Sequence, residues 1–367
     1  MPRVTLQTIA DRLGVSRMTV SNAFSRPDQL SAELRERVLA AARALGYVGP
    51  DPAARALARG TTGAVGVLLT DSLRYAFTDE IATGFLGAVV EELAPTGLAL
   101  TLLTSNERDD VIPARDVAID GALLYSCRPH STARDWLVRR NLPLVFVDQD
   151  PVPGIPSVNV DDRGGARKAA AHVVELGHRR IGIVTLAIDG SRGVVADPAT
   201  ATRAHPQRQR MLGWLDALDA AGLTATVVQA ASHDEDEAAD AARSLLAAAD
   251  ERPTAVLCFS DVVALGVIRA ARELGLGVPT DLSVVGFDDN PIARRHDPAL
   301  TTVRQDVAEK GRLAAAALTA AIERSRSGAK GRARHEVLPT ELVVRASTAP
   351  PAVSGSPSSR RVRRPAS

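Results

Sequence analysis

Residues 4–23 have the sequence VTLQTIADRLGVSRMTVSNA. Thr5 is a typical helix N-cap, and the apolar residues that follow it up to Leu13 recur at the spacing of one helix face. Gly14 ends this predicted helix, and Ser16 can cap a second one whose Val20 faces inward. Two short helices joined by a tight turn that contains glycine are typical of a helix-turn-helix, whose second helix fits the DNA major groove.

The rest of the N-terminal segment agrees with a small DNA-binding head. A third helix is predicted from Ser31 to Leu45, with Gly46 as its stop and Tyr47 closing the core. The first 60 residues hold nine arginines and five acidic residues, although the whole chain has a net charge of only +1. A basic head of this kind is expected to contact phosphates. A small helical module for protein contacts is the alternative.

Length and composition indicate a globular protein of two or three domains, because the 367 residues are 45% apolar. The sequence shows neither a signal peptide nor a long enough apolar run for a membrane span, so we expect a cytoplasmic protein. Cys127 and Cys258 lie in apolar, strand-like runs, where buried free thiols are expected.

Four segments are predicted: a helix-turn-helix domain over 1–48, a linker helix over 49–62, a two-lobed domain over 63–348 that binds a small molecule, and a disordered basic tail over 349–367. From residue 63 onward, short Val- and Leu-rich runs alternate with helical ones, which is typical of parallel sheets covered by helices. The predicted strands are 65–69, 98–104, 122–125, 144–147, 181–186, 225–229, 255–259 and 284–287. Residues 157–161 are expected to cross between two doubly wound lobes, and the extended segment 341–345 to return to the first.

Two doubly wound lobes bind small molecules where the carboxyl ends of their strands meet. Asp79 lies in the first strand-to-helix loop, and Asp289 follows the last predicted strand. For Asp261, which also follows a strand, a helix cap is the favoured interpretation. The long loop 187–206 is either a lid or a surface insertion. The candidate effector-binding residues are Thr70, Tyr75, Phe77, Asp148, Arg210, Ser260 and Asp288.

The sequence predicts no catalytic residue, no metal ligand and no cofactor. It has no glycine-rich phosphate loop after the first strand, no Gly-x-Ser-x-Gly elbow and no histidine pair at metal spacing. The functional alternative is a doubly wound enzyme, or a solute-binding protein, that carries an accessory DNA-binding head.

The chain resembles the LacI/GalR family of bacterial transcription repressors over nearly its whole length, to about Thr348. The motifs that carry the resemblance are Val4-Thr5-Leu6, Gly14-Val15-Ser16, Thr19-Val20-Ser21, Leu45-Gly46-Tyr47, Leu176-Gly177-His178, Ser283-Val284-Val285-Gly286-Phe287-Asp288-Asp289, Leu300-Thr301-Thr302-Val303 and Leu338-Pro339-Thr340-Glu341-Leu342. The resemblance implies an N-terminal all-α head, a periplasmic-binding-protein-like core of two lobes, and a homodimer that binds an inverted-repeat operator in double-stranded DNA. It also implies control by a small-molecule effector such as a sugar. By the same resemblance, residues 49–62 form a hinge helix and residues 63–348 form the effector-binding and dimerisation domain.

The resemblance further implies roles for individual residues. Arg17, Met18 and Asn22 match positions that face base edges, and Leu57 matches a leucine that wedges into the minor groove. The positions that match phosphate contacts or the helix cap beside them are Thr5, Ser16, Thr19, Ser21, Ser25 and Ser31. Phe77, Asp148, Arg210 and Asp288 match ligand-contacting positions, and Ser260 replaces an Asn or Asp of sugar-binding relatives. Residues 350–367 lack the leucine heptads of tetrameric members.

Overall fold

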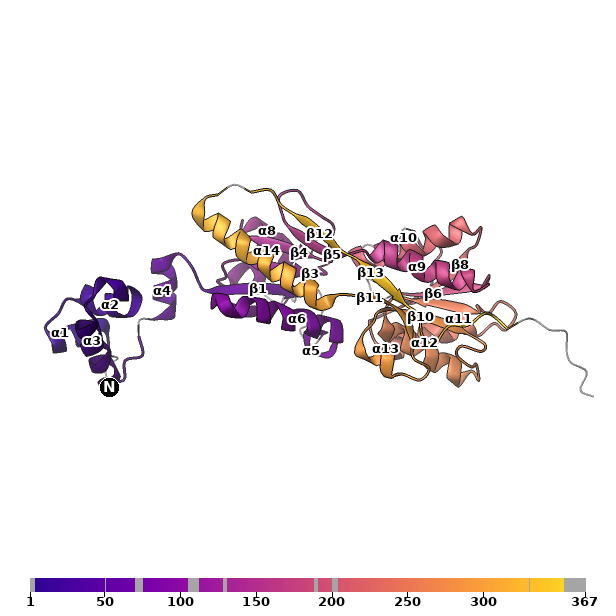
Figure 1. Cartoon of the computed structure of the whole chain (residues 1–367), viewed down its shortest axis with the longest axis horizontal. Helices are drawn as coiled ribbons and strands as arrows, with labels where there is room; N and C mark the ends of the chain where they lie inside the picture. Colours follow the sequence, from indigo (N-terminus) through magenta and orange to yellow (C-terminus); the bar gives the residue numbers. More distant parts are fainter. Residues whose placement is uncertain are drawn as a thin grey trace, which may run out of the picture. The chain divides into compact units, whose positions relative to one another are not determined.

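The structure, a computed structural model, describes residues 4–49, 51–69, 75–104, 112–127, 131–187, 191–199, 204–329 and 331–352. The chain forms two compact units (Figure 1). The head unit comprises Met1–Ala64 with Ala118–Asp120, and the core unit comprises Val65–Val117 with Gly121–Ser367. Within the described residues, no helix is both long and apolar enough to cross a membrane.

The head unit is helical. Its elements are α1 (Leu6–Leu13), α2 (Arg17–Ser25), the 3-10 turn η1 (Pro27–Gln29), α3 (Ala32–Ala44) and α4 (Pro52–Arg59). Side-chain oxygens cap three of these helices: Thr5, Ser16 and Ser31 each accept a hydrogen bond from the backbone N–H three residues later. The caps at Thr5 and Ser16 were predicted. Gly14 ends α1 at a φ of 66°, which a glycine adopts without a steric penalty.

A small apolar core holds the first three helices together. Ile9 and Ala10 of α1, Val20 and Ala23 of α2 and Val38 of α3 are buried in it. The rings of Phe24 and Tyr47 meet edge to face at its margin, with centroids 5.7 Å apart. The predicted helix-turn-helix is therefore confirmed, with the outer face of α2 left free of this core.

Asp120 anchors the segment that follows α4 in the head unit. Its carboxylate accepts hydrogen bonds from the Thr61 hydroxyl at 2.5 Å and from the backbone N–H groups of Thr62 and Gly63 at 2.7 and 3.0 Å. The Thr62 hydroxyl donates a fourth at 3.0 Å. Burial works to raise the pKa of Asp120, but these hydrogen bonds prevail and lower it.

The first lobe of the core unit is built on a six-stranded sheet of order β12-β5-β4-β3-β1-β2. Neighbouring strands from β12 to β1 run parallel. The strands are β1 (Ala64–Leu69), β2 (Ala99–Leu103), β3 (Ala122–Tyr125), β4 (Leu144–Val147), β5 (Ser157–Val160) and β12 (His335–Leu338). The helices are α5 (Tyr75–Thr78), α6 (Glu80–Leu93), the 3-10 turn η2 (Ala94–Thr96), α7 (Pro113–Asp116), α8 (Thr132–Arg139) and α14 (Val307–Ser327), which packs on α6.

The second lobe has a seven-stranded sheet of order β13-β11-β10-β9-β6-β8-β7, in which the edge strands β13 and β7 are antiparallel to their neighbours. The strands are β6 (Ile181–Leu186), β7 (Gly193–Val194), β8 (Ala225–Ala230), β9 (Ala255–Cys258), β10 (Ser283–Asp288), β11 (Thr301–Gln305) and β13 (Thr340–Val343). The helices are α9 (Asp162–Glu175), α10 (His205–Ala220), α11 (Glu235–Leu246), α12 (Asp261–Glu273) and α13 (Pro291–Arg295).

Alternating side chains of β6 supply two cores, one on each face of the second sheet. Ile181 and Ile183 belong to the core that includes Trp214 of α10, whereas Val184 and Leu186 belong to the core under α11 and α12. This period of two is what a parallel strand covered on both faces requires. The predicted doubly wound architecture is confirmed.

Two parts of the predicted chain path are wrong. Residues 157–160 form β5 inside the first sheet rather than a crossover, and their polar side chains concealed it: Asn159 is buried and bonded to both the N–H and the C=O of Gln149. The segment 341–345 does not return to the first lobe, because β13 pairs with β11 and Leu342 packs on the second lobe. The strand that returns is β12, seen beside β5 in Figure 1.

Three connections join the lobes: β5 to α9, β11 to α14, and β12 to β13. Two of them are bonded to each other, since the Asp161 N–H donates to the Leu338 carbonyl at 2.8 Å and the Thr340 hydroxyl donates to the Asp161 carbonyl at 2.9 Å. Strands that change lobes side by side make a natural hinge.

The predicted tail starts too early. The N–H of Ala349 donates to the Ser283 hydroxyl at 3.0 Å, and its carbonyl lies 2.9 Å from Nε2 of the buried His178. Ala349 is therefore fixed to the second lobe. Within the predicted tail, residues 353–367 lie outside the described residues.

Candidate DNA-binding surface and ligand pocket

The outer face of α2 carries the predicted base contacts. Arg17 is exposed, and the Met18 side chain is 68% exposed, an unusual position for a large apolar residue. Asn22 is half-buried, and its side-chain amide donates to the side-chain oxygen Oε1 of Gln29 at 3.1 Å. These three side chains lie on one helix face, where they meet the requirement for reading the edges of neighbouring bases.

The residues predicted to contact phosphates carry hydroxyl groups. Those of Thr5, Ser16 and Ser31 serve as helix caps, so each hydroxyl oxygen already accepts a backbone hydrogen bond. The Thr19 hydroxyl lies 2.9 Å from that of Ser16. The Ser25 hydroxyl donates to the carbonyl of Ser21 at 2.8 Å, so Ser25 must break this bond before it can donate to a phosphate.

Leu57 is an exposed apolar residue of α4, with 87% of its surface accessible. It stands between Arg55 and Arg59, which are also exposed. A helix that presents a leucine flanked by two arginines combines an apolar wedge with charges for the adjacent phosphates.

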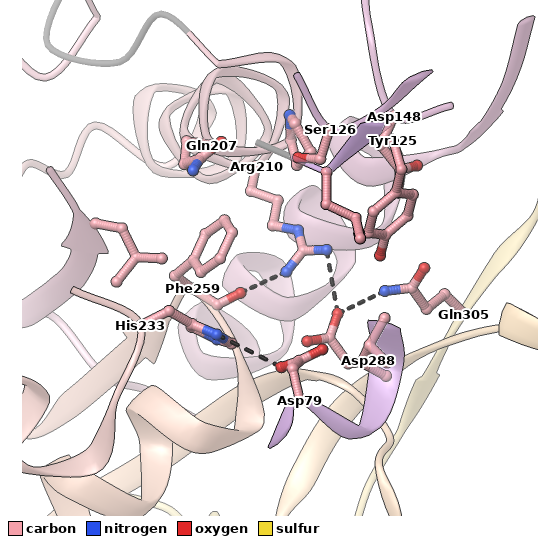
Figure 2. Close-up of a pocket in the computed structure, with 14 residues that line it drawn as sticks. Asp79, Tyr125, Ser126, Asp148, Gln207, Arg210, His233, Phe259, Asp288 and Gln305 are labelled. Carbon is pink, nitrogen blue, oxygen red and sulfur yellow. Dashed lines mark hydrogen bonds and ion pairs between the residues drawn. The ribbon is translucent and has the colours of Figure 1, made fainter. Parts of the chain in front are cut away.

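In the core unit, polar side chains from both lobes line one cavity of about 90 Å³. Most of them follow the carboxyl ends of parallel strands, which is where open α/β sheets bind ligands. The first lobe supplies Asp79, Tyr125, Ser126 and Asp148, and the second supplies Gln207, Arg210, His233, Phe259, Asp288 and Gln305 (Figure 2). Small-molecule pockets usually measure roughly 300 Å³ or more. A sugar-sized ligand therefore requires movement of the lobes or of these side chains.

Arg210 is a buried charged group of the pocket and makes three side-chain hydrogen bonds. Its guanidinium donates to Asp162 at 2.8 Å, to the Phe259 carbonyl at 2.6 Å and to Asp288 at 3.1 Å (Figure 2). It also lies 3.6 Å from the centre of the Phe287 ring. Burial raises the pKa values of Asp162 and Asp288, and the charge of Arg210 opposes that rise.

A second set of bonds connects Asp288 to the first lobe. The Gln305 amide donates to Asp288 at 2.6 Å, and its carbonyl oxygen accepts from Lys310 at 2.9 Å. The ammonium of Lys310, which is buried on α14, also pairs with Asp148 at 2.6 Å. Asp148, Lys310, Gln305, Asp288 and Arg210 thus form one continuous polar chain across the two lobes.

Backbone geometry also marks the pocket. Asp148 and Asp288 both have positive φ angles, 52° and 110°, which residues with a Cβ adopt at a cost. Each follows or ends a buried strand and turns its carboxylate toward the cavity (Figure 2). Strained backbone of this kind gathers at functional sites.

Histidines make two further contacts across the cleft. His233 Nδ1 lies 3.5 Å from Asp79, which caps α6, while its Nε2 lies 2.7 Å from the Ser260 hydroxyl. On the other side, His205 Nδ1 lies 2.8 Å from Asp150, and Arg208 pairs with the same carboxylate. His205 and Arg208 begin α10, so the end of the long loop 187–206 is tied to the first lobe.

The structure brings together only part of the predicted pocket. Asp148, Arg210 and Asp288 line it, whereas Phe77 is 70% exposed and is absent from its lining. Ser260 lies behind His233 and caps α12 through the Val263 N–H. Thr70 lies outside the described residues, as does the side chain of Tyr75.

Two neighbouring aspartates have structural roles. Asp261 is not the helix cap that was predicted, because Ser260 takes that position and Asp261 accepts from the Asn290 N–H and the Thr302 hydroxyl. Asp289 is bound by Arg304 and Arg345 at 2.7 and 2.5 Å. Neither carboxylate belongs to the pocket lining.

Several pocket residues were missed in the sequence. Tyr125 ends one predicted strand, Ser126 follows it, and Phe259 ends another, so the rule used for Asp148 would have found them. Gln305 ends β11, a strand that was not predicted. His233 lies in a loop without a distinctive motif.

The structure also bears on the two cysteines and on metal binding. Cys127 and Cys258 are buried free thiols, as predicted. Across the described part of the chain, no group of three or more His, Cys, Asp or Glu side chains is arranged to hold a metal ion.

Comparison with known proteins gives a consistent result. Residues 5–49 match the model of bacterial regulatory proteins of the lacI family, and residues 170–348 match a periplasmic binding protein-like domain. An HTH-type transcriptional regulator of Mycolicibacterium smegmatis is 39% identical over 95% of this chain and 98% of its own length.

Solved structures agree with the sequence relatives. A lac repressor dimer bound to operator and the anti-inducer ONPF is similar with a TM-score of 0.73 and 25% identity, over 94% of this chain and 99% of that one. A complex of the transcriptional regulator CelR with cellobiose is similar with a TM-score of 0.67 and 28% identity, over 94% and 100%. The chain has a helix-turn-helix head and a two-lobed core, and it matches a transcriptional regulator over nearly the full length of both proteins. It therefore belongs to the lacI family of bacterial regulatory proteins.

Proposed function

We propose that this DNA-binding transcriptional regulator is a repressor that binds a palindromic operator as a homodimer in the cytoplasm, and that a small polar ligand such as a sugar controls it. The observation that supports this most strongly is the combination, in one chain, of an exposed reading face on α2 with a polar pocket at the carboxyl ends of two parallel sheets. The complex of the related CelR with cellobiose supports a sugar as the class of ligand.

Each reading side chain of α2 has a preferred base. Arg17 suits the two acceptors of guanine, and Asn22 suits adenine once its amide leaves Gln29. Met18 has no donor and suits the methyl group of thymine. Thr5, Ser16, Thr19, Ser21, Ser25 and Ser31 would then fix the register on the phosphates without reading sequence.

Leu57 would act at the centre of the operator. An exposed leucine that enters the minor groove unstacks a base step and kinks the duplex, which allows more protein surface to contact DNA. Two heads of a dimer would place two such leucines about the operator's two-fold axis, which is why the operator should be an inverted repeat.

The ligand would act by changing how the two lobes close. Asp148 belongs to the first lobe, whereas Arg210 and Asp288 belong to the second, so a ligand that contacts all three favours one closure angle. If that angle also sets operator affinity, the two binding events change each other's free energy by the same amount.

The test is selection from a random DNA pool by the full-length protein, followed by titration of the enriched sequence. We expect a short palindrome, and we expect Arg17→Ala to lose about 1–3 kcal/mol of discrimination at one guanine of each half-site. Arg35→Ala on α3 is the matched control, because it removes the same charge from an exposed position outside the reading face. Sequence-blind binding by the wild type would refute the proposal.

A further inference from the structure

The pocket contains hydrogen-bond acceptors that the protein itself leaves unused. Oδ1 of Asp148 and Oε1 of Gln207 are both buried and have no hydrogen-bond partner. Both residues line the cavity, and the Asp148 side chain is only 7% exposed. A buried acceptor without a partner has lost its hydrogen bond to water without a replacement, which destabilises the empty pocket, more so when the acceptor is charged. A ligand that donates hydrogen bonds at these two oxygens removes that cost.

The charged donors at the cavity are, by contrast, bonded to protein groups, as is the Gln305 amide. Arg210 donates to Asp162, to Asp288 and to a carbonyl. The Gln305 amide donates to Asp288, and Lys310 donates to Asp148 and Gln305. Donors that enter the cavity therefore find two oxygens without partners, whereas acceptors that approach Arg210 or Lys310 meet groups already bonded to carboxylates.

The charges of the lining point in the same direction. Three carboxylates, those of Asp79, Asp148 and Asp288, face one arginine and one histidine. Lys310 neutralises part of this charge from behind Asp148 and is not itself part of the lining. A phosphate or carboxylate on the ligand would approach three buried carboxylates, and like charges repel more strongly in a buried site than in water.

Apolar side chains complete the lining. Leu69 and Ile81 come from the first lobe, and Leu186 comes from the second. Walls of this kind pack against the C–H faces of a sugar ring, while the hydroxyls at its rim reach the polar groups.

We infer that the ligand of this pocket is an uncharged, polyhydroxylated molecule whose hydroxyls donate to Asp148 and Gln207, and that phosphorylated and acidic forms of the same molecule are rejected. This inference rests on the proposed ligand control and narrows it to one chemical class. Lys310 is a positioning residue: its ammonium holds one oxygen of Asp148 and leaves the other directed to the ligand.

The experiment is a calorimetric titration of the full-length protein with neutral sugars and their anionic counterparts. The probes are glucose with glucose 6-phosphate and glucuronate, ribose with ribose 5-phosphate, and cellobiose. We expect at least one neutral probe to bind at least about tenfold more tightly than its anionic counterparts, the minimum for one hydrogen bond to a charged group. Tighter binding of an anionic form, or no binding by any neutral probe, overturns the inference.

Variants then locate the effect. Asp148→Asn keeps the volume of the side chain but removes its charge, and should weaken the best neutral probe at least about tenfold. Asp216→Asn is the matched control, because Asp216 is a partly exposed carboxylate paired with Arg163 outside the lining, and affinity should be unchanged. Unchanged affinity in Asp148→Asn refutes the role of Asp148.

The operator titration separates this inference from the proposed function. If an anionic probe binds and shifts operator affinity, ligand control is upheld and the inference about the ligand's charge is wrong. If a neutral probe binds in the predicted manner but operator affinity stays constant, the inference is upheld and the proposed coupling is wrong.

Discussion

Replacement of Arg210 by methionine should destabilise the core unit strongly at neutral pH. Arg210 is 4% exposed and pairs with two carboxylates, Asp162 and Asp288, that are themselves buried. Methionine fills a similar volume but leaves both carboxylates without their cation. Removal of one partner from a buried ion pair costs about 3–5 kcal/mol, so we expect a loss of at least that size.

The loss should shrink as the pH falls. Burial already raises the pKa values of Asp162 and Asp288 above those of the unfolded chain, and loss of the arginine raises them further. A carboxyl whose pKa is higher in the folded than in the unfolded chain stabilises the folded state fully at a pH below its unfolded-state pKa. That stabilisation is lost as the pH rises through its folded-state pKa. Arg210→Met should therefore lose less stability at pH 5 than at pH 7.

The assay is urea unfolding followed by tryptophan fluorescence at both pH values. Trp214 is buried on the same helix as Arg210, so its emission reports on the packing of that helix. Arg163→Met is the control, because Arg163 forms a partly exposed pair with Asp216 and should cost no more than about 1 kcal/mol. A loss from Arg210→Met that is equally small, or that does not depend on pH, would refute the reasoning.

Three further predictions concern the head unit and the C-terminal segment. Leu57→Ala should weaken binding to the selected operator far more than binding to random DNA in parallel titrations, and equal losses would reject the wedge. Asp120→Ala removes the carboxylate that accepts hydrogen bonds from Thr61, Thr62 and Gly63, so proteolysis near residue 60 should accelerate. An unchanged cleavage rate would show that the carboxylate does not hold this segment. Burial lowers the pKa of His178, so the neutral side chain contributes fully to stability above the ordinary value of 6.5 and less as the pH falls below it. The urea midpoint should therefore fall less between pH 7.5 and 5.5 in His178→Gln than in the wild type. An equal fall in both proteins would contradict this.

The head could be predicted from the sequence because its signals are local. Thr5, Ser16 and Ser31 cap their own helices within three residues, and Gly14 ends α1 by its own backbone conformation. Such short-range chemistry does not depend on the rest of the fold.

The pocket could be predicted only in part, because its groups come from strands far apart in the chain. Asp148 and Arg210 were found by their places at the ends of apolar strands or at the start of a helix. Gln305 was missed because β11, with its two threonines and an arginine, does not have the apolar pattern of a buried strand. Lys310 was missed for a different reason: a lysine on a helix is expected to face solvent, and only the fold brings it against Asp148.

The assignment of Ser260 illustrates the same limit. Its place after β9 suggested a ligand contact, but the hydroxyl accepts the Val263 N–H and lies beside His233. A serine at the end of a strand serves equally as the cap of the following helix, and the sequence alone does not distinguish the two roles.

The central claim is that a ligand in the core pocket controls DNA binding by the head. The most direct measurement is the equilibrium affinity of the full-length protein for its selected operator, with and without a saturating concentration of the neutral sugar that binds best. We predict a change in operator affinity of at least about fivefold, the lower end of ordinary coupling between sites. We predict no such change for Arg210→Met, measured without urea at a pH where that variant is folded. An operator affinity that is the same with and without the bound sugar would contradict the account.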